Sequence, residues 1–293
     1  MTPLKANDIT IRDPYVLVHE GKYYMYGTRS HLTWKKPEDL SSQGFDVYVS
    51  DDLENFSEPI EVFKRPDDFW SDRNFWAPEV HEYQGAFYLF ATFIGPDRRR
   101  GTQILKSESP LGPFMVHSPE ALTPKEWECL DGTFYVSQSG VPYMVFCHEW
   151  VQIKYGTICA IELSLDLKHP VGEPFELINA KDPSWADGDG GKDRYVTDGP
   201  CFYRTKSGEL LMFWSSLKNG AYVEAISISS NGEIDGDWTT YDELLYEEDG
   251  GHGMAFTNLN GELTFTLHAP NVNYQEHPVF LKLEDLGDRV VAV

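Results

Sequence analysis

Asp13-Pro14-Tyr15-Val16-Leu17-Val18, a turn at Gly21 and then Tyr23-Tyr24-Met25-Tyr26 form the first copy of a pattern that recurs along the chain. A polar or small residue opens a short strand, a glycine makes a turn, and an aromatic strand returns. Short runs of aromatic and β-branched residues, broken by Gly, Pro and Asp, are typical of β-structure. Helical periodicity is nearly absent, so the pattern predicts an all-β chain.

Four more copies of this hairpin follow. They open at 76–80, 131–136, 198–203 and 251–256 and turn at Gly85, Gly140, Gly208 and Gly261. The opening positions Asp13, Pro78, Asp131, Asp198 and His252 are 65, 53, 67 and 54 residues apart. A repeat of this length, each copy beginning with a hairpin, indicates the blades of a propeller.

A second hairpin completes each repeat. Its first strand is expected at 46–50, 101–105, 158–162 and 223–227, and residues 277–293 complete the fifth repeat. Two hairpins supply four antiparallel strands. The sequence therefore predicts a five-bladed β-propeller with four antiparallel strands per blade, as one domain over residues 1–293.

The propeller architecture brings distant polar residues together. The first strand of each blade lines the central channel, so Asp13, Asp131, Asp198 and His252 are expected to converge at one end of it. A single Asp before Pro or Gly often only makes a turn. Three aspartates that open three repeats in the same register favour a functional site, because a turn alone would accept Asn, Ser or Gly.

Composition limits the class of partner. The 293 residues carry 24 Lys and Arg against 47 Asp and Glu, a formal net charge of −23. Such a chain repels nucleic acid and anionic membrane surfaces, so neither is expected as a partner. An uncharged substrate is compatible with this charge. Most of the carboxylates are explained by the need for solubility and not by a binding function. Aromatic residues make up 14% of the chain, and they suit both strands and sugar-stacking platforms.

The N-terminal segment has neither a basic region nor an apolar core, and no stretch approaches the about 20 apolar residues of a membrane span. A cytoplasmic protein is expected, although a secreted protein whose leader had been removed would look the same. Cys129, Cys147, Cys159 and Cys201 are scattered without zinc-site spacing. The last three lie in apolar runs, where we expect small buried side chains.

Six motifs, taken in order, resemble glycoside hydrolase family 43. They are Ile-Arg-Asp-Pro-Tyr at 11–15, Trp-Ala-Pro-Glu-Val at 76–80, Leu-Asp-Gly-Thr-Phe at 130–134, Phe-Cys-His-Glu-Trp at 146–150, Thr-Asp-Gly-Pro at 197–200 and Gly-His-Gly-Met at 251–254. The match covers essentially the whole chain. The resemblance implies a five-bladed propeller that hydrolyses glycosidic bonds with inversion. It also implies plant oligosaccharide or polysaccharide substrates: arabinofuranosides, xylosides and arabinans, with galactans in some branches.

The resemblance also implies roles for the acidic residues. Asp13 matches the general base, and Asp131 matches the aspartate that orients the acid and tunes its pKa. Asp198 stands where the family normally has the general acid Glu. Asp is one methylene shorter, which withdraws the proton donor by about 1.5 Å. Glu149, in the motif at 146–150, is the alternative acid and otherwise a substrate-binding residue.

Other residues beside the motifs are candidates for substrate or ion binding. Trp76, Trp150 and Trp214 are expected to contact the sugar, although most aromatic residues of a propeller pack between blades. Arg12 either points inward beside the base or forms a surface ion pair. The resemblance implies that His252 helps to hold a structural calcium ion in the channel, although a lone histidine is often only structural. No cofactor is required for the chemistry, and no catalytic zinc site is indicated.

Two other functions remain open. A retaining fructoside hydrolase of the related clan would use Trp127-Glu128-Cys129 as its acid motif, but its Asn-Asp-Pro-Asn-Gly nucleophile motif is absent. A catalytically inactive carbohydrate-binding propeller would explain why Asp198 departs from the family's Glu.

Overall fold

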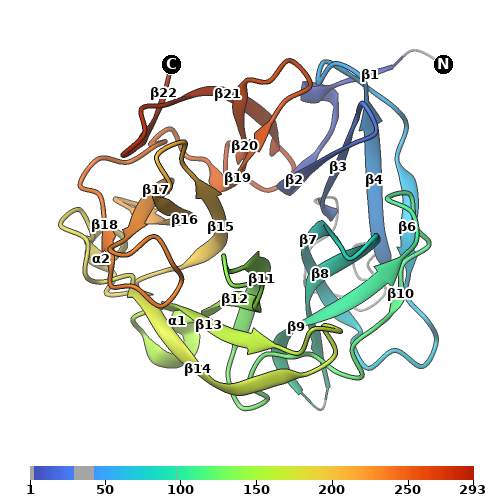
Figure 1. The fold of residues 1–293 in the computed structure, drawn as a ribbon, viewed down its shortest axis with the longest axis horizontal. Helices are drawn as coiled ribbons and strands as arrows, with labels where there is room; N and C mark the ends of the chain where they lie inside the picture. The colour runs from blue at the N-terminus through green and yellow to red at the C-terminus, as the bar shows by residue number, and fades with distance from the viewer. Residues whose placement is uncertain (1–2, 30–42, 97) are drawn as a thin grey trace.

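The computed structural model describes residues 3–29, 43–96 and 98–293, and within them five antiparallel sheets stand around a central opening (Figure 1). The fold is the predicted all-β, five-bladed propeller. The first strand of each sheet is the innermost and faces the opening. These strands are β2 (Ile11–His19), β7 (Arg73–Tyr83), β11 (Cys129–Val136), β15 (Asp198–Arg204) and β19 (Gly251–Thr257).

The remaining strands follow outward from the channel, and the expected second hairpins are confirmed. Blade 1 adds β3 (Lys22–Arg29), β4 (Gly44–Ser50) and β6 (Ile60–Lys64), with the two-residue strands β1 (Leu4–Lys5) and β5 (Asn55–Phe56). Blade 2 adds β8 (Ala86–Gly95), β9 (Arg98–Ser107) and β10 (Met115–Val116); blade 3 adds β12 (Pro142–His148), β13 (Thr157–Leu163) and β14 (Pro170–Asn179). Blade 4 adds β16 (Leu210–Lys218), β17 (Ala221–Ser229) and β18 (Trp238–Thr240); blade 5 adds β20 (Leu263–Ala269), β21 (His277–Asp285) and β22 (Val290–Ala292).

Helical segments in the described ranges are short. They are the 3₁₀ turn η1 (Ala6–Asp8), α1 (Trp150–Ile153) and α2 (Gly188–Gly191). None of these helices is long and apolar enough to cross a membrane.

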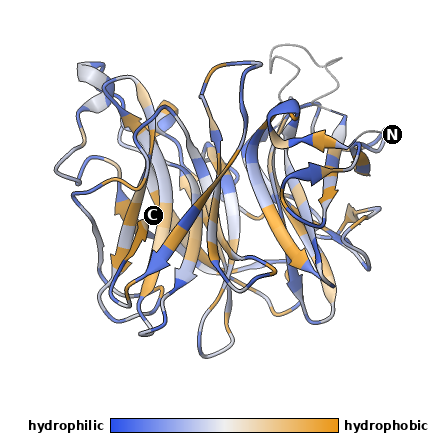
Figure 2. Ribbon diagram, turned by 90° about the horizontal axis from the view of Figure 1, so that it is seen from above, coloured by the Kyte–Doolittle hydropathy of each residue, from blue (hydrophilic) through white to orange (hydrophobic). Residues whose placement is uncertain are grey.

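The core is divided among the contacts between neighbouring blades. Five clusters of buried hydrophobic residues occupy the five boundaries, including the one between the last blade and the first. A middle strand such as β8 is therefore buried on both faces, which explains its continuous apolar run. Figure 2 shows the hydrophobic residues concentrated along the strands and hydrophilic residues in the connecting loops. The four cysteines are buried and unpaired, as expected for small core side chains.

Every inner strand contains a β-bulge at its channel end. The bulge places one residue in the left-handed region, with φ between 46° and 55°, and these residues are Asp13, Ala77, Asp131, Gly199 and His252. A bulge re-aims the side chains beside it. The bulge therefore directs the residues at this end of each of the five inner strands toward the axis of the channel.

The bulges correct the predicted register. Asp13, Asp131 and His252 share the left-handed position, but Asp198 lies one residue before it and corresponds to Arg12. Gly199 takes the left-handed position in blade 4, where glycine adopts that conformation without steric cost. The prediction that Asp198 shares the register of the other two aspartates is therefore wrong by one residue. In blade 2 the residue at this position is Ala77, and not Pro78, which the repeat predicted.

The backbone N–H of each left-handed residue donates to the preceding blade. Ala77 donates to Thr28 Oγ1 (2.7 Å), Asp131 to Thr92 Oγ1 (2.8 Å), His252 to Ser215 Oγ (2.6 Å) and Asp13 to His268 Nδ1 (3.1 Å). Blade 3 has Cys147 at the acceptor position, and the amide of Gly199 donates instead to Asp131 Oδ2 (3.0 Å). These five bonds form a closed ring that fixes each blade against the next, and we call it the amide ring.

Blade 5 closes the propeller against blade 1 without exchanging a strand. The amide of Ile11 donates to the carbonyl of Glu276 (3.1 Å), beside the Asp13–His268 bond. Ile9, Ile11 and Met254 are buried together in the cluster at this boundary. The first and last parts of the chain therefore meet at the channel.

Replacing Thr92 by Val tests the amide ring. The change keeps the side chain's shape but leaves the buried N–H of Asp131 without its acceptor, which costs about 1–3 kcal/mol. We expect a loss of that size in the free energy of unfolding, measured by urea denaturation.

Thr266→Val is the matched control. Among the described residues the buried hydroxyl of Thr266 has no partner, so its removal is expected to be neutral or stabilising. Equal losses in both variants would show that the amide ring contributes nothing to stability.

Candidate active site

A pocket of about 400 Å³ opens at the channel end that carries the bulges. All five blades contribute to its lining. Eight of the nine residues predicted for the site line it: Arg12, Asp13, Trp76, Asp131, Glu149, Trp150, Asp198 and His252. The predicted convergence of residues distant in sequence is thus present in the structure.

Asp13 is held from several sides. Its Oδ2 accepts a hydrogen bond from Thr28 Oγ1 (2.6 Å), and its Oδ1 lies 3.3 Å from Nδ1 of His252. Burial would raise the pKa of Asp13, but the positive charges of His252 and Arg12 outweigh burial and lower it below the ordinary value. Asp13 is therefore ionised at neutral pH, as a general base must be.

His268 presents a neutral ring to the same carboxyl group. Burial and the nearby Arg12 lower the pKa of His268 to about 3. Its unprotonated Nδ1 can therefore accept the amide hydrogen of Asp13. Arg12 lines the pocket beside Asp13, as the first reading expects, and it forms an ion pair with the buried carboxylate of Glu276 (2.8 Å) in place of a surface ion pair.

His252 carries positive charge at the centre of the site. Its Nδ1 lies 3.3 Å from Asp13 and 3.6 Å from Asp131. Burial would lower the pKa of His252, but the carboxylates of Asp13, Asp131 and Asp198 outweigh it and raise the pKa to about 9. The imidazolium is thus the internal counterion of the aspartates.

The resemblance implies a calcium ion beside His252, and calcium takes about six to eight oxygen ligands. In the described part of the chain, no group of three or more His, Cys, Asp and Glu is arranged to hold a metal ion. The calcium ion expected at His252 stays a prediction.

Asp131 and Asp198 hold protons more strongly than ordinary aspartates. Burial raises the pKa of Asp131 well above its usual value, and the charges of Asp198 and Asp13 add to this against the opposing effect of His252. Burial also raises the pKa of Asp198, although His252 and a hydrogen bond from Tyr222 Oη (3.0 Å) partly offset it. Close carboxylates do not all ionise at once, which favours a shared proton here.

Glu149 faces the pocket from the end of β12, and its side chain is 8% exposed. Its Oε2 forms an ion pair with Arg100, whose guanidinium lies 4.9 Å from the ring centre of Trp76. Burial raises the pKa of Glu149 to about 7 despite Arg100, and the charge of Asp198 adds to the increase. Glu149 can therefore hold or release a proton near neutral pH.

The prediction that Trp214 contacts the substrate is wrong. Its side chain is 0% exposed and packs in the core between blades 3 and 4, where its ring lies 5.7 Å from that of Trp185. Its indole N–H donates to Ser227 (2.9 Å). Trp214 directly precedes Ser215 of the amide ring, but its side chain lies in the core between the blades and not in the channel, so its position next to a site residue in the sequence was misleading. Trp76 and Trp150 do line the pocket.

Sequence reasoning missed several polar residues that line the pocket, among them Tyr222 and Arg100, and it missed Glu224, which is buried behind Ser215. Tyr222 and Glu224 lie in the apolar strand β17, and Arg100 lies in a basic run at the start of β9. Glu224 is fully buried, accepts a hydrogen bond from Ser215 (2.6 Å), and has a pKa that burial raises to about 8. No motif marks these residues. A charged residue inside an apolar strand was the one available signal for Glu224.

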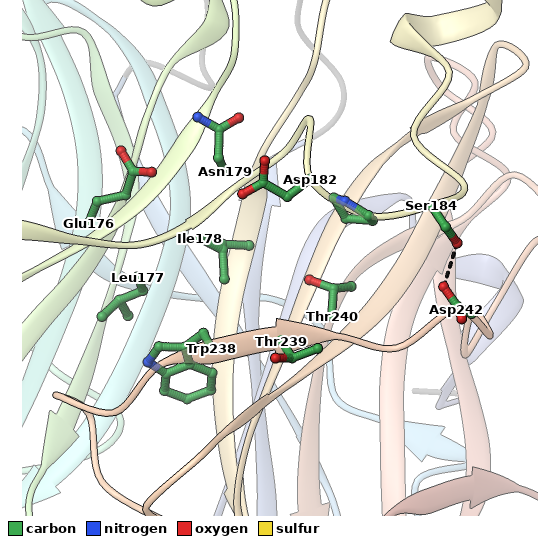
Figure 3. Close-up of a pocket in the computed structure, with 11 residues that line it drawn as sticks. Glu176, Leu177, Ile178, Asn179, Asp182, Ser184, Trp238, Thr239, Thr240 and Asp242 are labelled. Carbon is green, nitrogen blue, oxygen red and sulfur yellow. Dashed lines mark hydrogen bonds between the residues drawn. The ribbon is translucent and has the colours of Figure 1, made fainter.

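A second hollow of similar size lies on the outside of the propeller, between β14 and β18 (Figure 3). Trp238, Asp182 and Glu176 line it, and Ser184 donates a hydrogen bond to Asp242 across it. None of the residues predicted for the site lies there. The groove occupies the space between the outer strands of two adjacent blades, and it is separate from the channel site.

Comparisons with known proteins agree on one family. The sequence profile of the glycosyl hydrolases of family 43 matches residues 7–283. A solved endo-arabinase structure from Bacteroides thetaiotaomicron is 36% identical, with a TM-score of 0.87 over 97% of this chain and 98% of that one.

Two further relatives are more distant. An endo-1,4-beta-xylanase structure from the same organism is 22% identical, with a TM-score of 0.80 over 100% of this chain and 97% of that one. Xylosidase/arabinosidase 43A of Humicola insolens is 29% identical over 157 residues, which are 51% of this chain. The match spans about half of that protein, 47% of its length.

Protonation of His252 predicts a pH-dependent stability. The folded pKa of about 9 lies above the ordinary value of 6.5, so its contribution is fully present below pH 6.5 and is lost as the pH rises through 9. The difference corresponds to about 3 kcal/mol. We expect the free energy of unfolding to fall by up to that amount between pH 6.5 and 9.5, beyond any fall in His252→Gln. Parallel pH profiles for the two proteins would contradict the charge assignment.

Proposed function

The chain belongs to the glycosyl hydrolases of family 43, and from that membership we propose that it hydrolyses pentosidic bonds in plant-derived oligosaccharides or polysaccharides. The sugar is an α-L-arabinofuranoside or a β-D-xyloside. The names of the relatives support this range, because they include an endo-arabinase and a xylosidase/arabinosidase. The observation that carries the proposal is the convergence of four carboxyl groups of different protonation on one pocket.

In the proposed reaction Asp13 is the general base. Its carboxylate takes a proton from a water molecule while the water oxygen attacks the anomeric carbon. A carboxylic acid on the other side of the sugar protonates the departing oxygen, so the configuration at the anomeric carbon inverts. Asp198, at the family's acid position, and Glu149 are the two residues that can supply this proton. Asp131, which matches the family's tuning aspartate, accepts a hydrogen bond from the amide of Gly199, next to Asp198.

Two aromatic residues suit a sugar. Trp76 and Trp150 flank the pocket from blades 2 and 3, and Arg194 lies 5.5 Å from the ring centre of Trp150. One face of Trp76 is covered by Arg100. The flat apolar rings suit the C–H face of a sugar, and the charged groups beside them can form hydrogen bonds with its hydroxyl groups.

The alternative of a retaining fructoside hydrolase would need Glu128 as its acid, but Glu128 is engaged elsewhere. Glu128 forms an ion pair with Arg99 (3.0 Å) and accepts a hydrogen bond from the amide of Arg100. It does not belong to the lining of the channel pocket in the described chain. The carbohydrate-binding alternative differs from the proposal only in turnover, which the following experiment measures.

Asp13→Asn tests the proposed base. Loss of the proton acceptor is expected to reduce turnover by about 10²- to 10⁴-fold while the protein stays folded. Hydrolysis is measured on aryl α-L-arabinofuranosides and β-D-xylosides and on arabinan and xylan oligosaccharides.

Asp51→Asn is the control, because Asp51 is exposed, lies in the same blade and pairs with Lys22 outside the pocket. It should leave turnover unchanged. Near-normal activity of Asp13→Asn would exclude Asp13 as the base, and sugar binding by the wild type without turnover would establish the binding-only alternative.

A further inference from the structure

A left-handed turn lies just before β15, whose first residue, Asp198, lines the pocket. The four residues of α2 (Gly188–Gly191) have φ between 57° and 83°, and Asp189 is the only one of the four that is not glycine. Glycine adopts this conformation without steric cost, whereas a residue with a Cβ is strained in it. Such strain is kept where the surrounding structure requires it, so the side chain of Asp189 is a candidate for a function.

The carboxyl group of Asp189 is buried against one guanidinium. Its side chain is 0% exposed, and its Oδ2 accepts a hydrogen bond from Nε of Arg194 (2.6 Å) and lies 2.5 Å from Nη2 of the same group. Nζ of Lys192 lies 3.1 Å from the same oxygen. A buried carboxylate needs a paired cation, and two nitrogens of one planar group fix the direction of that cation. Asp189 therefore holds the guanidinium of Arg194 in one place.

Arg194 carries this constraint to the pocket. Its guanidinium lies 5.5 Å from the ring centre of Trp150, where a cation and an aromatic face attract each other. Trp150 lines the pocket, whereas Arg194 is not among the lining residues in the described part of the chain. Arg194 therefore covers the side of the Trp150 ring that is turned away from the pocket. The other side is left for a ligand.

Backbone hydrogen bonds anchor both ends of this arrangement. The amide of Tyr195 donates to the carbonyl of Lys154 (3.3 Å), and the amide of Gly156 donates to the carbonyl of Tyr195 (2.8 Å). These bonds tie the segment of Arg194 to the segment that follows Trp150. The amide of Asn219, in the turn between β16 and β17, donates to Asp187 Oδ2 (2.8 Å), which ties the left-handed turn to blade 4.

Resting on the proposed function, we propose that Asp189 is a positioning residue for substrate binding. Through Arg194 it fixes the ring of Trp150 as one wall of the sugar site. Asp189 does not touch the substrate and takes no part in proton transfer. A contact surface that is fixed in advance loses less entropy when the sugar binds, so the pair acts on KM and not on kcat.

The kinetics of Asp189→Asn test this role. Asparagine has nearly the same size and tolerates the left-handed conformation, but it lacks the charge that holds Arg194. On aryl α-L-arabinofuranosides and β-D-xylosides and on arabinan and xylan oligosaccharides, we expect KM to rise about three- to thirtyfold, the range for the loss of one cation–π contact. We expect kcat to change by less than about twofold. Urea denaturation of each variant checks that the assays use folded protein.

Asp193→Asn is the matched control. Asp193 lies in the same segment, is also left-handed (φ 58°), and pairs with Lys154 (2.5 Å) through a side chain that is 61% exposed. The same chemical change at this position should leave KM and kcat at the wild-type values. A similar rise in KM in both variants would reduce the effect to the charge of the segment and overturn the inference.

A double-mutant cycle tests the route through Arg194. Arg194→Ala should raise KM about as much as Asp189→Asn does, and the double variant should raise it no further, because the two residues act as one unit. In a Trp150→Ala background Asp189→Asn should leave KM unchanged. Effects that add in either combination would show that Asp189 acts by another route.

The remaining outcomes are distinguishable. A fall in kcat at constant KM in Asp189→Asn would overturn the inference and leave the proposed function intact. If Asp189→Asn does not fold, Arg194→Ala decides alone, and an unchanged KM in that variant would overturn the inference. A wild type that hydrolyses none of the glycosides would remove the proposed function together with this inference.

Discussion

The site depends on the amide ring, in which a left-handed residue of each blade donates its backbone N–H to the blade before it. Unpaired N–H groups in a buried channel are costly, so each blade must place an acceptor where the next blade bends. The same bends aim Asp13, Asp131 and His252 at the axis. One backbone requirement therefore sets both the spacing of the blades and the direction of the functional side chains.

The ring is also where the protein departs from strict repetition. Blade 3 has Cys147 where blades 1, 2 and 4 have hydroxyl groups, and the amide of Gly199 turns to the carboxylate of Asp131. This bond places Asp131 against blade 4, beside Asp198. His252 supplies the positive charge that allows several carboxyl groups to share so small a volume.

The sequence was sufficient for the fold because each blade repeats the same hairpin with a turn glycine at its tip. It also identified eight pocket residues, since residues that open inner strands must meet in a propeller. The predicted register of Asp198 was wrong by one residue. The position of the bulge in β15 decides this register, and no residue pattern in the sequence predicted that position. The predicted substrate contact of Trp214 was wrong because adjacency in the sequence does not tell which side of a blade a side chain faces. The partners of Asp198 and Glu149, Tyr222 and Arg100, come from outer strands whose register only the structure gives.

The central claim is that carboxyl groups from separate blades act on opposite sides of one sugar with water between them. Proton NMR of the sugar released in the first minutes of hydrolysis, before mutarotation, measures this most directly. Arabinofuranose released from an α-arabinofuranoside, or xylose from a β-xyloside, should appear first as the opposite anomer. Release of the same anomer as the substrate would show that a side chain attacks the sugar, and the account of the site would be wrong.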